Sequence, residues 1–500
     1  MLQGGATQPI TNLMVSAVVA VIAWGALAFG AVYSWAFGPL LIACAAIGAF
    51  GIVVYRSRPQ DRATRLAILS IVAVLAAACI QVVPLPASRL AAISPGTHAF
   101  LVDFDFSYAL GIESGSLWRP LSLAPKATAT GIGFLAAFTL FLAGLTRGLS
   151  ASRVRALATW LVAVGVMLAL AGIVQKAAIG DHAWGGMKIY GFWTPRNLLT
   201  TPFGPFINKN HFAGWMLMGI PLALGLAIGR AEHAMRRLHG GWRSRLSWLS
   251  TPEGGRLQIA AIAALAMGAS LLLTRSRSGV VCLLFSMLLF SVAARRRYGS
   301  IRAGWTAFAS LAVIFGIAFS LAGAELTARI STRMDAVELR KNIWSDSARI
   351  IRDFPIAGTG LNTFGTAMIA YQTTQRDQHF QEAHNDYLQV MVEGGLLVAL
   401  PAALALVLMA RAIRRRFVAR EDDSRTYWIR TGATIGLLAI ALQSAVEFSL
   451  QMPGNAAMFV VLLAMALHQP SSARTNERRL ASEPVRSDRR RDLQIGSHTP

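Results

Sequence analysis

Long apolar runs separated by short polar stretches dominate this chain. A helix of about 20 apolar residues spans the hydrocarbon core of a bilayer, so each run of that length predicts a transmembrane helix. The runs lie at residues 14–36, 37–55, 66–86, 127–146, 156–176, 211–230, 258–274, 278–294, 304–324, 387–410, 431–447 and 455–468. The pattern predicts an all-α polytopic transmembrane bundle of about 12 helices, within a range of about 10 to 12.

Composition supports a membrane protein over a soluble one. The chain is 54% hydrophobic and 14% charged, with a mean hydropathy of +0.50, whereas a soluble domain carries roughly 25% charged residues. The net charge of +23 does not indicate a nucleic-acid partner, because the basic residues lie in blocks between the apolar runs. Cys44, Cys79 and Cys282 fall inside apolar runs, so they predict neither disulfides nor a metal site.

Basic residues predict the orientation of the helices. About two-thirds of the 47 Lys and Arg residues lie in segments that alternate along the helix order and therefore share one face of the membrane. Such segments are cytoplasmic in most membrane proteins, so we expect both termini in the cytoplasm. The segment MLQGGATQPITN has no basic residue, and no small-residue cleavage site follows its apolar run, so we expect that run to be retained as the first helix. The segments are 55–66, 147–155, 230–257, 295–302, 411–430 and 469–500.

The opposite face carries the longer polar loops, at 87–126, 177–210 and 325–386. The third loop has helical periodicity from Asp335 to Asp353, which predicts an amphipathic helix, and Pro355 ends it. The following Gly358 and Gly360 predict a turn.

Polar side chains gather at the predicted outer ends of five helices. Ionisable groups at this depth are costly unless they face a cavity or a partner, so each is a functional candidate. Arginine suits phosphate because its planar fork donates two parallel hydrogen bonds, and a histidine can accept a proton near neutral pH. The pattern therefore favours chemistry on an anion. The residues are Arg275, Arg277, Asn208, Lys209, Asn210, His211, His384, Asn385, Asp386, Glu393, Glu447 and Gln451.

Four segments carry a resemblance to a known family. They are GPFINKNHFAGWM at 204–216, LTRSRSGVV at 273–281, RKNIWSDSARIIRDFPIAGTGLNTF at 340–364 and HNDYLQVMVEGGLL at 384–397. In this order they resemble the O-antigen ligase and O-antigen polymerase family. The resemblance covers roughly residues 200–465, while residues 1–200 match only in being helical.

The resemblance implies a glycosyltransferase of the bacterial inner membrane with a periplasmic active site and a helical fold like that of GT-C-type enzymes. Such enzymes transfer a glycan from undecaprenyl diphosphate to an acceptor hydroxyl on lipid A-core, a protein or another glycan. They invert the anomeric centre and use no metal or cofactor. Ligase and polymerase activities share these motifs, so both remain open.

Residue by residue, His384 matches the catalytic histidine of the family, and Arg277 and Arg340 match arginines that bind the diphosphate. Arg275 competes with Arg277 for that role, because a small register error would exchange them. Glu447 is interpreted as a bonded helix-end residue, and Trp184 and Trp193 as interfacial anchors or sugar platforms. The supporting candidates are Glu393, Asn385, Asn210, Lys209 and His211, of which the last three also suit a helix-entry cap.

The chain is expected to contain three parts. Residues 1–200 form N-terminal transmembrane helices, and 201–468 form the O-antigen ligase-like catalytic membrane region, including the periplasmic loop 325–386. Residues 469–500 have almost no apolar content, which predicts a disordered basic tail near membrane lipids.

Two other classes of function are alternatives. A transporter or flippase for envelope polysaccharide or a small anion would place charges near the bilayer midplane in two related halves, and neither feature is evident. A binding or scaffold subunit of an envelope assembly needs no histidine at all.

Overall fold

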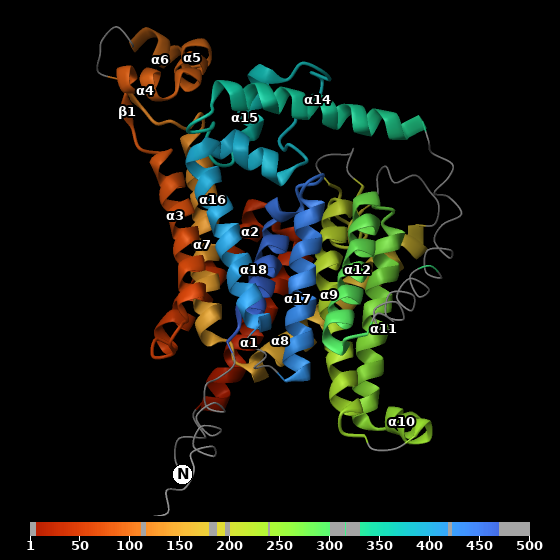
Figure 1. The fold of residues 1–500 in the computed structure, drawn as a ribbon. Helices are drawn as coiled ribbons and strands as arrows, with labels where there is room; N and C mark the ends of the chain where they lie inside the picture. The colour runs from red at the N-terminus through yellow and green to blue at the C-terminus, as the bar shows by residue number, and fades with distance from the viewer. Residues whose placement is uncertain are drawn as a thin grey trace, which may run out of the picture.

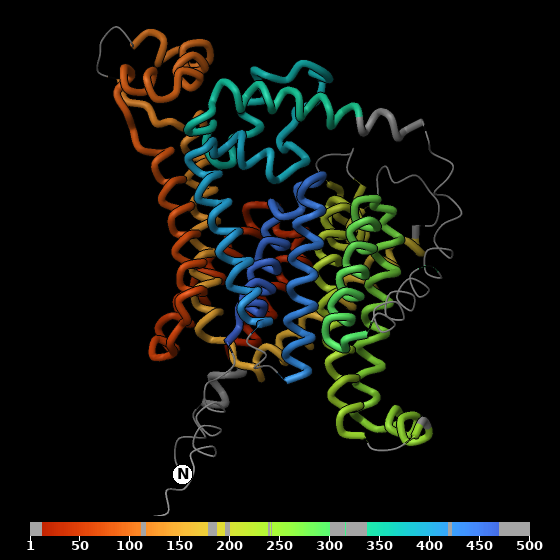
Figure 2. Tube along the Cα trace, viewed as in Figure 1, coloured from red at the N-terminus to blue at the C-terminus, as the bar shows by residue number. Residues whose placement is uncertain are grey.

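The computed structural model describes residues 7–111, 117–179, 188–195, 201–238, 241–300, 316, 331–418 and 423–469. Figures 1 and 2 show these residues as a bundle of long helices with shorter elements across one end. The helices are α1 (Thr7–Leu27), α2 (Ser34–Val54), α3 (Arg62–Ile80), α4 (Ala87–Ile93), α5 (Pro95–Phe104), α6 (Phe106–Gly111), α7 (Pro125–Gly148), α8 (Ala151–Ile179), α9 (Lys209–Met235), α10 (Trp242–Leu249), α11 (Pro252–Leu273), α12 (Arg277–Tyr298), α14 (Ser331–Asp353), α15 (Phe364–Tyr371), α16 (Asp386–Val418), α17 (Ser424–Gln443) and α18 (Pro453–Leu467). Short 3₁₀ turns are η1 (Phe29–Ala31) and η3 (Ser449–Gln451), and β1 (Leu85–Pro86) pairs antiparallel with β2 (Trp118–Arg119).

The predicted all-α membrane fold is confirmed. In the described part of the chain, 8 helices are long and apolar enough to cross a membrane, and two shorter apolar helices cover Leu13–Leu27 and Pro453–Leu467. With α17, these helices account for every predicted apolar run except 304–324, which lies outside the described residues apart from Gly316.

The boundary between the first two helices differs from the prediction. The run 14–36 was expected to be one helix, but α1 ends at Leu27 and α2 begins at Ser34. Phe29, Gly30 and Ala31 all have positive φ angles, of 60°, 73° and 58°. Hydropathy does not detect this turn, because its residues are as apolar as the helices on either side.

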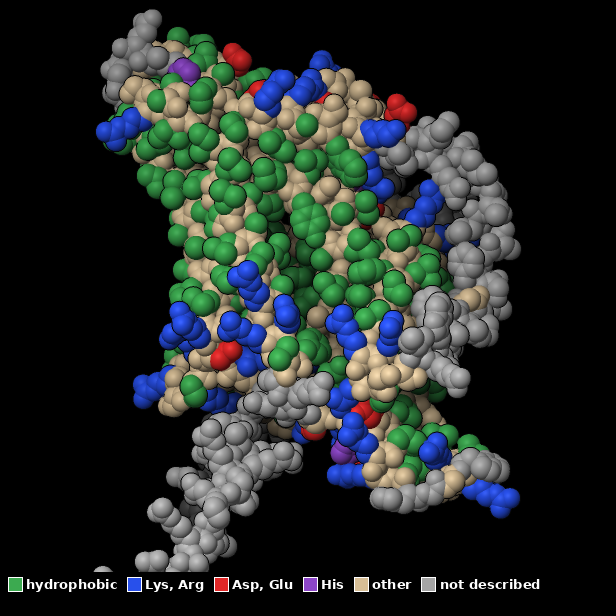
Figure 3. All heavy atoms as spheres, viewed as in Figure 1, with side chains coloured by type: hydrophobic (Ala, Val, Ile, Leu, Met, Phe, Trp, Pro, Cys, Tyr) green, Lys and Arg blue, Asp and Glu red, His purple; other side chains and the backbone are tan. Residues whose placement is uncertain are grey.

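The described parts of the loops 87–126 and 325–386 form a cap over one end of the bundle. We define the cap as α4, α5, α6, α14 and α15, and Figure 1 shows α14 lying across the helix ends with α10 at the opposite end. The amphipathic helix predicted to end at Asp353 is α14, which does end there. Figure 3 shows hydrophobic side chains along the sides of the bundle and many Lys and Arg side chains toward the end opposite the cap.

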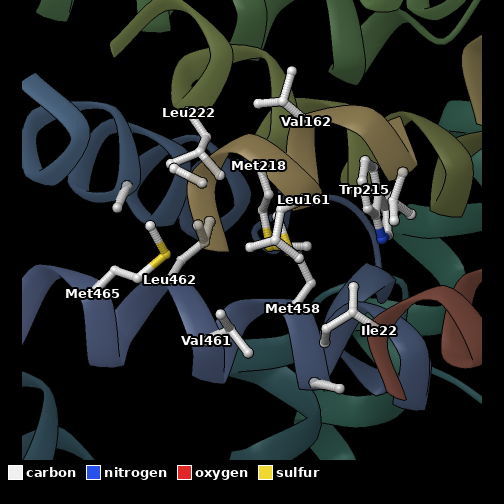
Figure 4. Packing of buried hydrophobic residues seen from close by; sticks show 14 of the residues in the cluster. Ile22, Leu161, Val162, Trp215, Met218, Leu222, Met458, Val461, Leu462 and Met465 are labelled. Atoms are coloured by element: carbon white, nitrogen blue, oxygen red, sulfur yellow. The ribbon is translucent and has the colours of Figure 1, made fainter. Parts of the chain in front are cut away.

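The bundle core consists of apolar side chains from helices that are distant in sequence. Figure 4 shows Leu161 of α8, Trp215 and Met218 of α9, and Met458 and Val461 of α18 packed together. All five side chains are fully buried, with 0% exposure. Close packing of this kind holds α9 in a defined position within the bundle. The polar residues of its first turn are therefore held in position as well.

Glycines allow α9 and α17 to pack with their backbones nearly in contact. A Cβ atom at Gly432 of α17 would lie 2.3 Å from the carbonyl oxygen of Pro221, and one at Gly225 of α9 would lie 2.3 Å from that of Trp428. Small residues permit such close approach between membrane helices. The contact sets the relative positions of the α9 start and the α17 end.

Helix α16 is broken by an inserted loop. At Gly395 the backbone has φ 52° and ψ −161°, and the interrupted helix bonds instead to the loop after α14. Thr359 N donates to Val392 O at 3.0 Å, and Leu397 N donates to Ile356 O at 2.9 Å. The loop is therefore joined to α16 by backbone hydrogen bonds, as a neighbouring strand would be.

The side chain of Gln81, 0% exposed at the end of α3, completes this junction. Its Nε2 donates to Ala357 O at 2.7 Å and Glu393 O at 2.8 Å, and its Oε1 accepts from Leu361 N at 3.1 Å. Three buried backbone groups thereby gain partners. The motifs around Gly358 and Gly395 thus have a structural role, which is to join the cap to the helix that follows His384.

Substitution of Gly432 by Ala is expected to destabilise the protein by about 1–3 kcal/mol, because the new methyl group meets a backbone atom that cannot move aside. The matched control is Gly133→Ala, where a Cβ atom has no neighbour within 4 Å. Thermal unfolding of the purified protein in detergent should show a lower midpoint for Gly432→Ala alone. Equal midpoints for both variants would contradict this account of the α9–α17 contact.

Candidate functional site

His384 lies in the short segment that leads from the cap into α16. Its φ angle is 50°, a conformation that costs a non-glycine residue of order 1–3 kcal/mol and persists only when the surroundings enforce it. Gln389 Oε1 accepts from Ala383 N at 2.9 Å, Trp344 Nε1 donates to Ala383 O at 3.0 Å, and Asp386 N donates to Ser444 O at 2.8 Å. These bonds on both sides hold the histidine in place.

Two neighbours of His384 have roles in the chain itself. Asn385 Oδ1 accepts from Leu388 N at 3.0 Å, which is the bond of a helix N-cap. Burial raises the pKa of Glu382, and His384 acts in the opposite direction. Asn385 therefore caps the start of α16, and its supporting role in the site stays a prediction.

Glu447 joins the predicted site residues to one another. Arg340 Nη2 donates to its Oε1 at 2.5 Å, and Asn210 Nδ2 donates to the same oxygen at 2.8 Å. His384 Nδ1 lies 3.6 Å from its Oε2, which is within ion-pair range but longer than a hydrogen bond. We call these four residues the Glu447 cluster. They come from the first turn of α9, from α14, from the segment before α16 and from the segment after α17.

Exposure divides the Glu447 cluster into a buried acid and two accessible groups. The side chain of Glu447 is 2% exposed, whereas those of His384 and Arg340 are 31% and 32% exposed. A buried carboxylate is stable only when charged and hydrogen-bonding partners surround it. The acid therefore holds an imidazole and a guanidinium side by side while both remain open to a ligand.

The first turn of α9 forms the floor of the cluster. The carbonyl of Asn210 accepts from Gln443 Nε2 at 3.2 Å and Ser449 Oγ at 3.3 Å. His211 is 5% exposed, and its ring packs edge-on against Phe448 at 4.6 Å between centroids. Phe448 packs in the same way against His384 at 4.8 Å. His211 thus packs against Phe448, and its supporting role in the site stays a prediction.

Lys209 is the first residue of α9, and its N–H donates to Thr201 O at 2.8 Å. Asn208 precedes it as the N-cap and accepts from Asn210 N at 2.8 Å. The alternative of a helix-entry cap therefore describes Asn208, while Asn210 extends toward Glu447.

Glu393, predicted as a supporting residue, lies behind the site. It is 7% exposed and accepts from Asn362 N at 2.8 Å, from Phe364 N at 3.1 Å and from Gln389 Nε2 at 3.0 Å. Gln389 also accepts from Ala383 N. Glu393 therefore links the α16 junction to the backbone beside His384 and acts through position.

Arg275 and Arg277 flank the turn between α11 and α12. Arg275 has a φ angle of 55°, and Arg277 is the first residue of α12, which Ser276 caps by accepting from Gly279 N at 3.3 Å. A Cβ atom at Gly279 would lie 3.1 Å from the Cβ of Ala213, so this turn adjoins the first turn of α9. Within the described structure, no hydrogen bond or ion pair joins Arg277 to the Glu447 cluster.

The sequence places Glu447 among the polar groups at the outer helix ends, where it is interpreted as a bonded helix-end residue with no specific role in the site. The available signal was a carboxylate in an otherwise apolar segment, SAVEFSL at 444–450, at the predicted level of the other polar groups. Among the described residues, no group of three or more His, Cys, Asp and Glu side chains is placed to hold a metal ion. Trp184 lies outside the described residues.

The fold and the Glu447 cluster define a multi-pass helical membrane protein with an arginine, a histidine and a carboxylate at one end of its bundle. Residues 262–403 match the family model described as O-antigen ligase, which supports the family resemblance of the three motifs at 273–281, 340–364 and 384–397. The match supports a membrane glycan ligase or polymerase, a glycosyltransferase-like enzyme of the inner membrane. A search of curated proteins found no match.

Removing the charge of Glu447 is expected to destabilise the protein measurably. In Glu447→Gln, Arg340 and Asn210 lose a charge-assisted partner, which is worth roughly 1.5–3 kcal/mol. The control is Asp105→Asn, which removes an ion pair to Arg119 whose side chains are 32% and 29% exposed, and surface pairs contribute less than about 1 kcal/mol. Thermal unfolding of both variants tests this. If Glu447→Gln lowered the unfolding midpoint less than Asp105→Asn does, the buried Glu447 carboxylate would not be the residue that stabilises the cluster.

Proposed function

We propose that this chain transfers a glycan from an undecaprenyl-diphosphate carrier to an acceptor hydroxyl at the periplasmic face of the inner membrane. The observation that carries the proposal is the Glu447 cluster, in which one buried acid contacts a half-buried imidazole and a half-buried guanidinium. General-base chemistry and diphosphate binding require these two groups next to each other.

In the proposed reaction, His384 Nε2 accepts the proton of the acceptor hydroxyl. The oxygen of that hydroxyl attacks the anomeric carbon at the same time. The bond from that carbon to the diphosphate oxygen breaks, and undecaprenyl diphosphate leaves with the electron pair. Attack from the face opposite the leaving group inverts the anomeric centre. Proton removal of this kind typically accelerates a reaction by about 10²–10⁴-fold.

Glu447 is the positioning residue for this step. Because it lies 3.6 Å from His384 Nδ1, it favours the tautomer with the proton on Nδ1 and leaves the Nε2 lone pair for the acceptor. It also stabilises the imidazolium that forms, as the acid of a catalytic triad does. Shortening of this contact in the substrate complex would complete the hydrogen bond.

Arg340 would hold the diphosphate as charge develops on it, with Arg275 and Arg277 at the neighbouring turn as further donors. A guanidinium keeps its charge at every physiological pH, so a cluster of them stabilises a leaving diphosphate electrostatically. The acceptor is lipid A-core, a protein hydroxyl or a growing glycan. Membrane lipids surround the site and supply the carrier.

Replacing His384 by Ala is expected to lower product formation by about 10²–10⁴-fold and to leave the protein folded. The matched control is His379→Ala, an exposed histidine of the same cap segment. Purified proteins would be incubated with undecaprenyl-diphosphate-linked glycan and acceptor, and product measured by gel shift or mass spectrometry. Undiminished turnover in His384→Ala would remove the proposed base.

Arg340→Gln is expected to lower kcat/KM for the lipid-linked donor by about 10- to 100-fold, the equivalent of one charge-assisted hydrogen bond. Arg340→Lys should recover only part of the loss, because an ammonium group lacks the fork of two donors. Arg352→Gln, on the same helix with a 75% exposed side chain, should behave like the wild type. Equal kinetics for the Gln variants at 340 and 352 would exclude a diphosphate role for Arg340.

Ligase and polymerase activities are separated by the glycan that accumulates in a strain lacking this chain. Lipid-linked polymer would indicate a ligase, because chains are made but not transferred. Lipid-linked single repeat units would indicate a polymerase. Complementation with His384→Ala and His379→Ala ties the phenotype to the proposed chemistry.

A further inference from the structure

A polar pocket lies at the end of the bundle opposite the cap. It has a volume of about 230 Å³ and is formed by α8, α9, α10, α11 and α17. Arg230, in its wall, lies about 20 residues after Asn210 on α9, which is roughly 30 Å along the helix axis. One bilayer thickness therefore separates this pocket from the Glu447 cluster. The charged residues that line it are Arg155, Arg230, Arg256, Arg425 and Glu253.

The positive charge of this pocket is incompletely neutralised by the described residues. Arg155 pairs with Asp423 at 3.3 Å. Arg230, in contrast, donates to Arg256 O at 2.6 Å and to Thr159 Oγ1 at 3.4 Å, and neither acceptor is charged.

Within the part of the chain that the structure describes, no carboxylate forms an ion pair with the guanidinium of Arg230, Arg256 or Arg425. The Nε of Arg425 is buried and has no hydrogen-bond partner there. Like charges held together in a partly buried space repel one another unless an anion lies between them. The pocket is therefore built for an anionic ligand.

The remaining wall indicates the kind of anion. Trp248, Leu226 and Ile429 line the pocket together with the arginines, so a ligand would meet both guanidinium forks and apolar groups. Arginine forks match phosphate oxygens, and the apolar wall suits the glycerol and upper acyl region of a lipid. Basic pockets between transmembrane helices bind anionic headgroups in this way.

We propose that this arginine pocket is a phosphate-binding site filled by the headgroup of an anionic phospholipid from the leaflet at the end opposite the cap. The site is independent of glycan transfer, because it shares no residue with the Glu447 cluster. It anchors α9 and α17 to each other at one end, while Asn210 and Glu447 do so at the other.

The test is lipid binding by the purified chain in a neutral detergent. Native mass spectrometry would follow titrations with phosphatidylglycerol and, as a neutral comparator, phosphatidylcholine, and a third arm would use inorganic phosphate alone with thermal unfolding as the readout. The pocket variant is Arg230→Gln with Arg425→Gln. The control is Arg295→Gln with Arg296→Gln, which removes two exposed arginines of the α12 terminus that do not line the pocket.

We expect the wild type to retain phosphatidylglycerol in preference to phosphatidylcholine. The pocket variant should bind phosphatidylglycerol about 10- to 30-fold more weakly, because each of its two missing arginines would contribute a factor of about 3 to 5 to the affinity. The control should stay within about threefold of the wild type. If the double variant unfolds, Arg256→Gln replaces it, because that side chain is exposed, and about 3- to 10-fold weakening is expected.

Equal weakening by the pocket and control variants would overturn the proposal, because it would indicate general attraction to anionic lipid. Stabilisation by inorganic phosphate without any preference for phosphatidylglycerol would overturn the lipid assignment. Selective loss in the pocket variant, with no effect of inorganic phosphate, supports the headgroup site.

Discussion

The buried carboxylate of Glu447 determines how the chain is arranged at the capped end of the bundle. Its side chain is 2% exposed, and an ion removed from water requires partners with good geometry. The structure supplies Arg340 from the cap, Asn210 from the first turn of α9, and His384 from the entrance of α16. Segments separated by up to 237 residues in sequence therefore have to converge on one point.

The rest of the architecture serves this convergence. Backbone-close packing of α9 against α17 fixes the distance between Asn210 and the end of α17, and the junction at the α16 break fixes the cap relative to His384. The unfavourable φ angle of His384 is maintained by bonds on both sides of it. Side chains held in this way would not have to reorganise in the proposed reaction.

Much of this molecule follows from its sequence. Apolar run lengths predict the helices because the bilayer imposes a length, and the end of α14 at Asp353 follows from periodicity and Pro355. The motifs predict His384 and Arg340 as site residues. The family model matches the segment that contains both. Periodicity does not reveal which partners Glu447 has, because they are long-range contacts. For the same reason periodicity does not reveal that Asn385 and Glu393 bond to the chain's own backbone, or that His211 packs against Phe448. The turn at Phe29–Ala31 escapes hydropathy because it is apolar.

The junction between the loop after α14 and the break in α16 has a consequence for engineering. A Cβ atom at Gly358 would lie 2.4 Å from Glu393 O, and one at Gly395 would lie 2.5 Å from Gly358 N. A change in the backbone on one side of the junction therefore requires a matching change on the other side. Chimeras that exchange cap segments between related enzymes must therefore take residues 355–397 as one piece. A crossover inside that stretch would separate two halves of a single backbone fit.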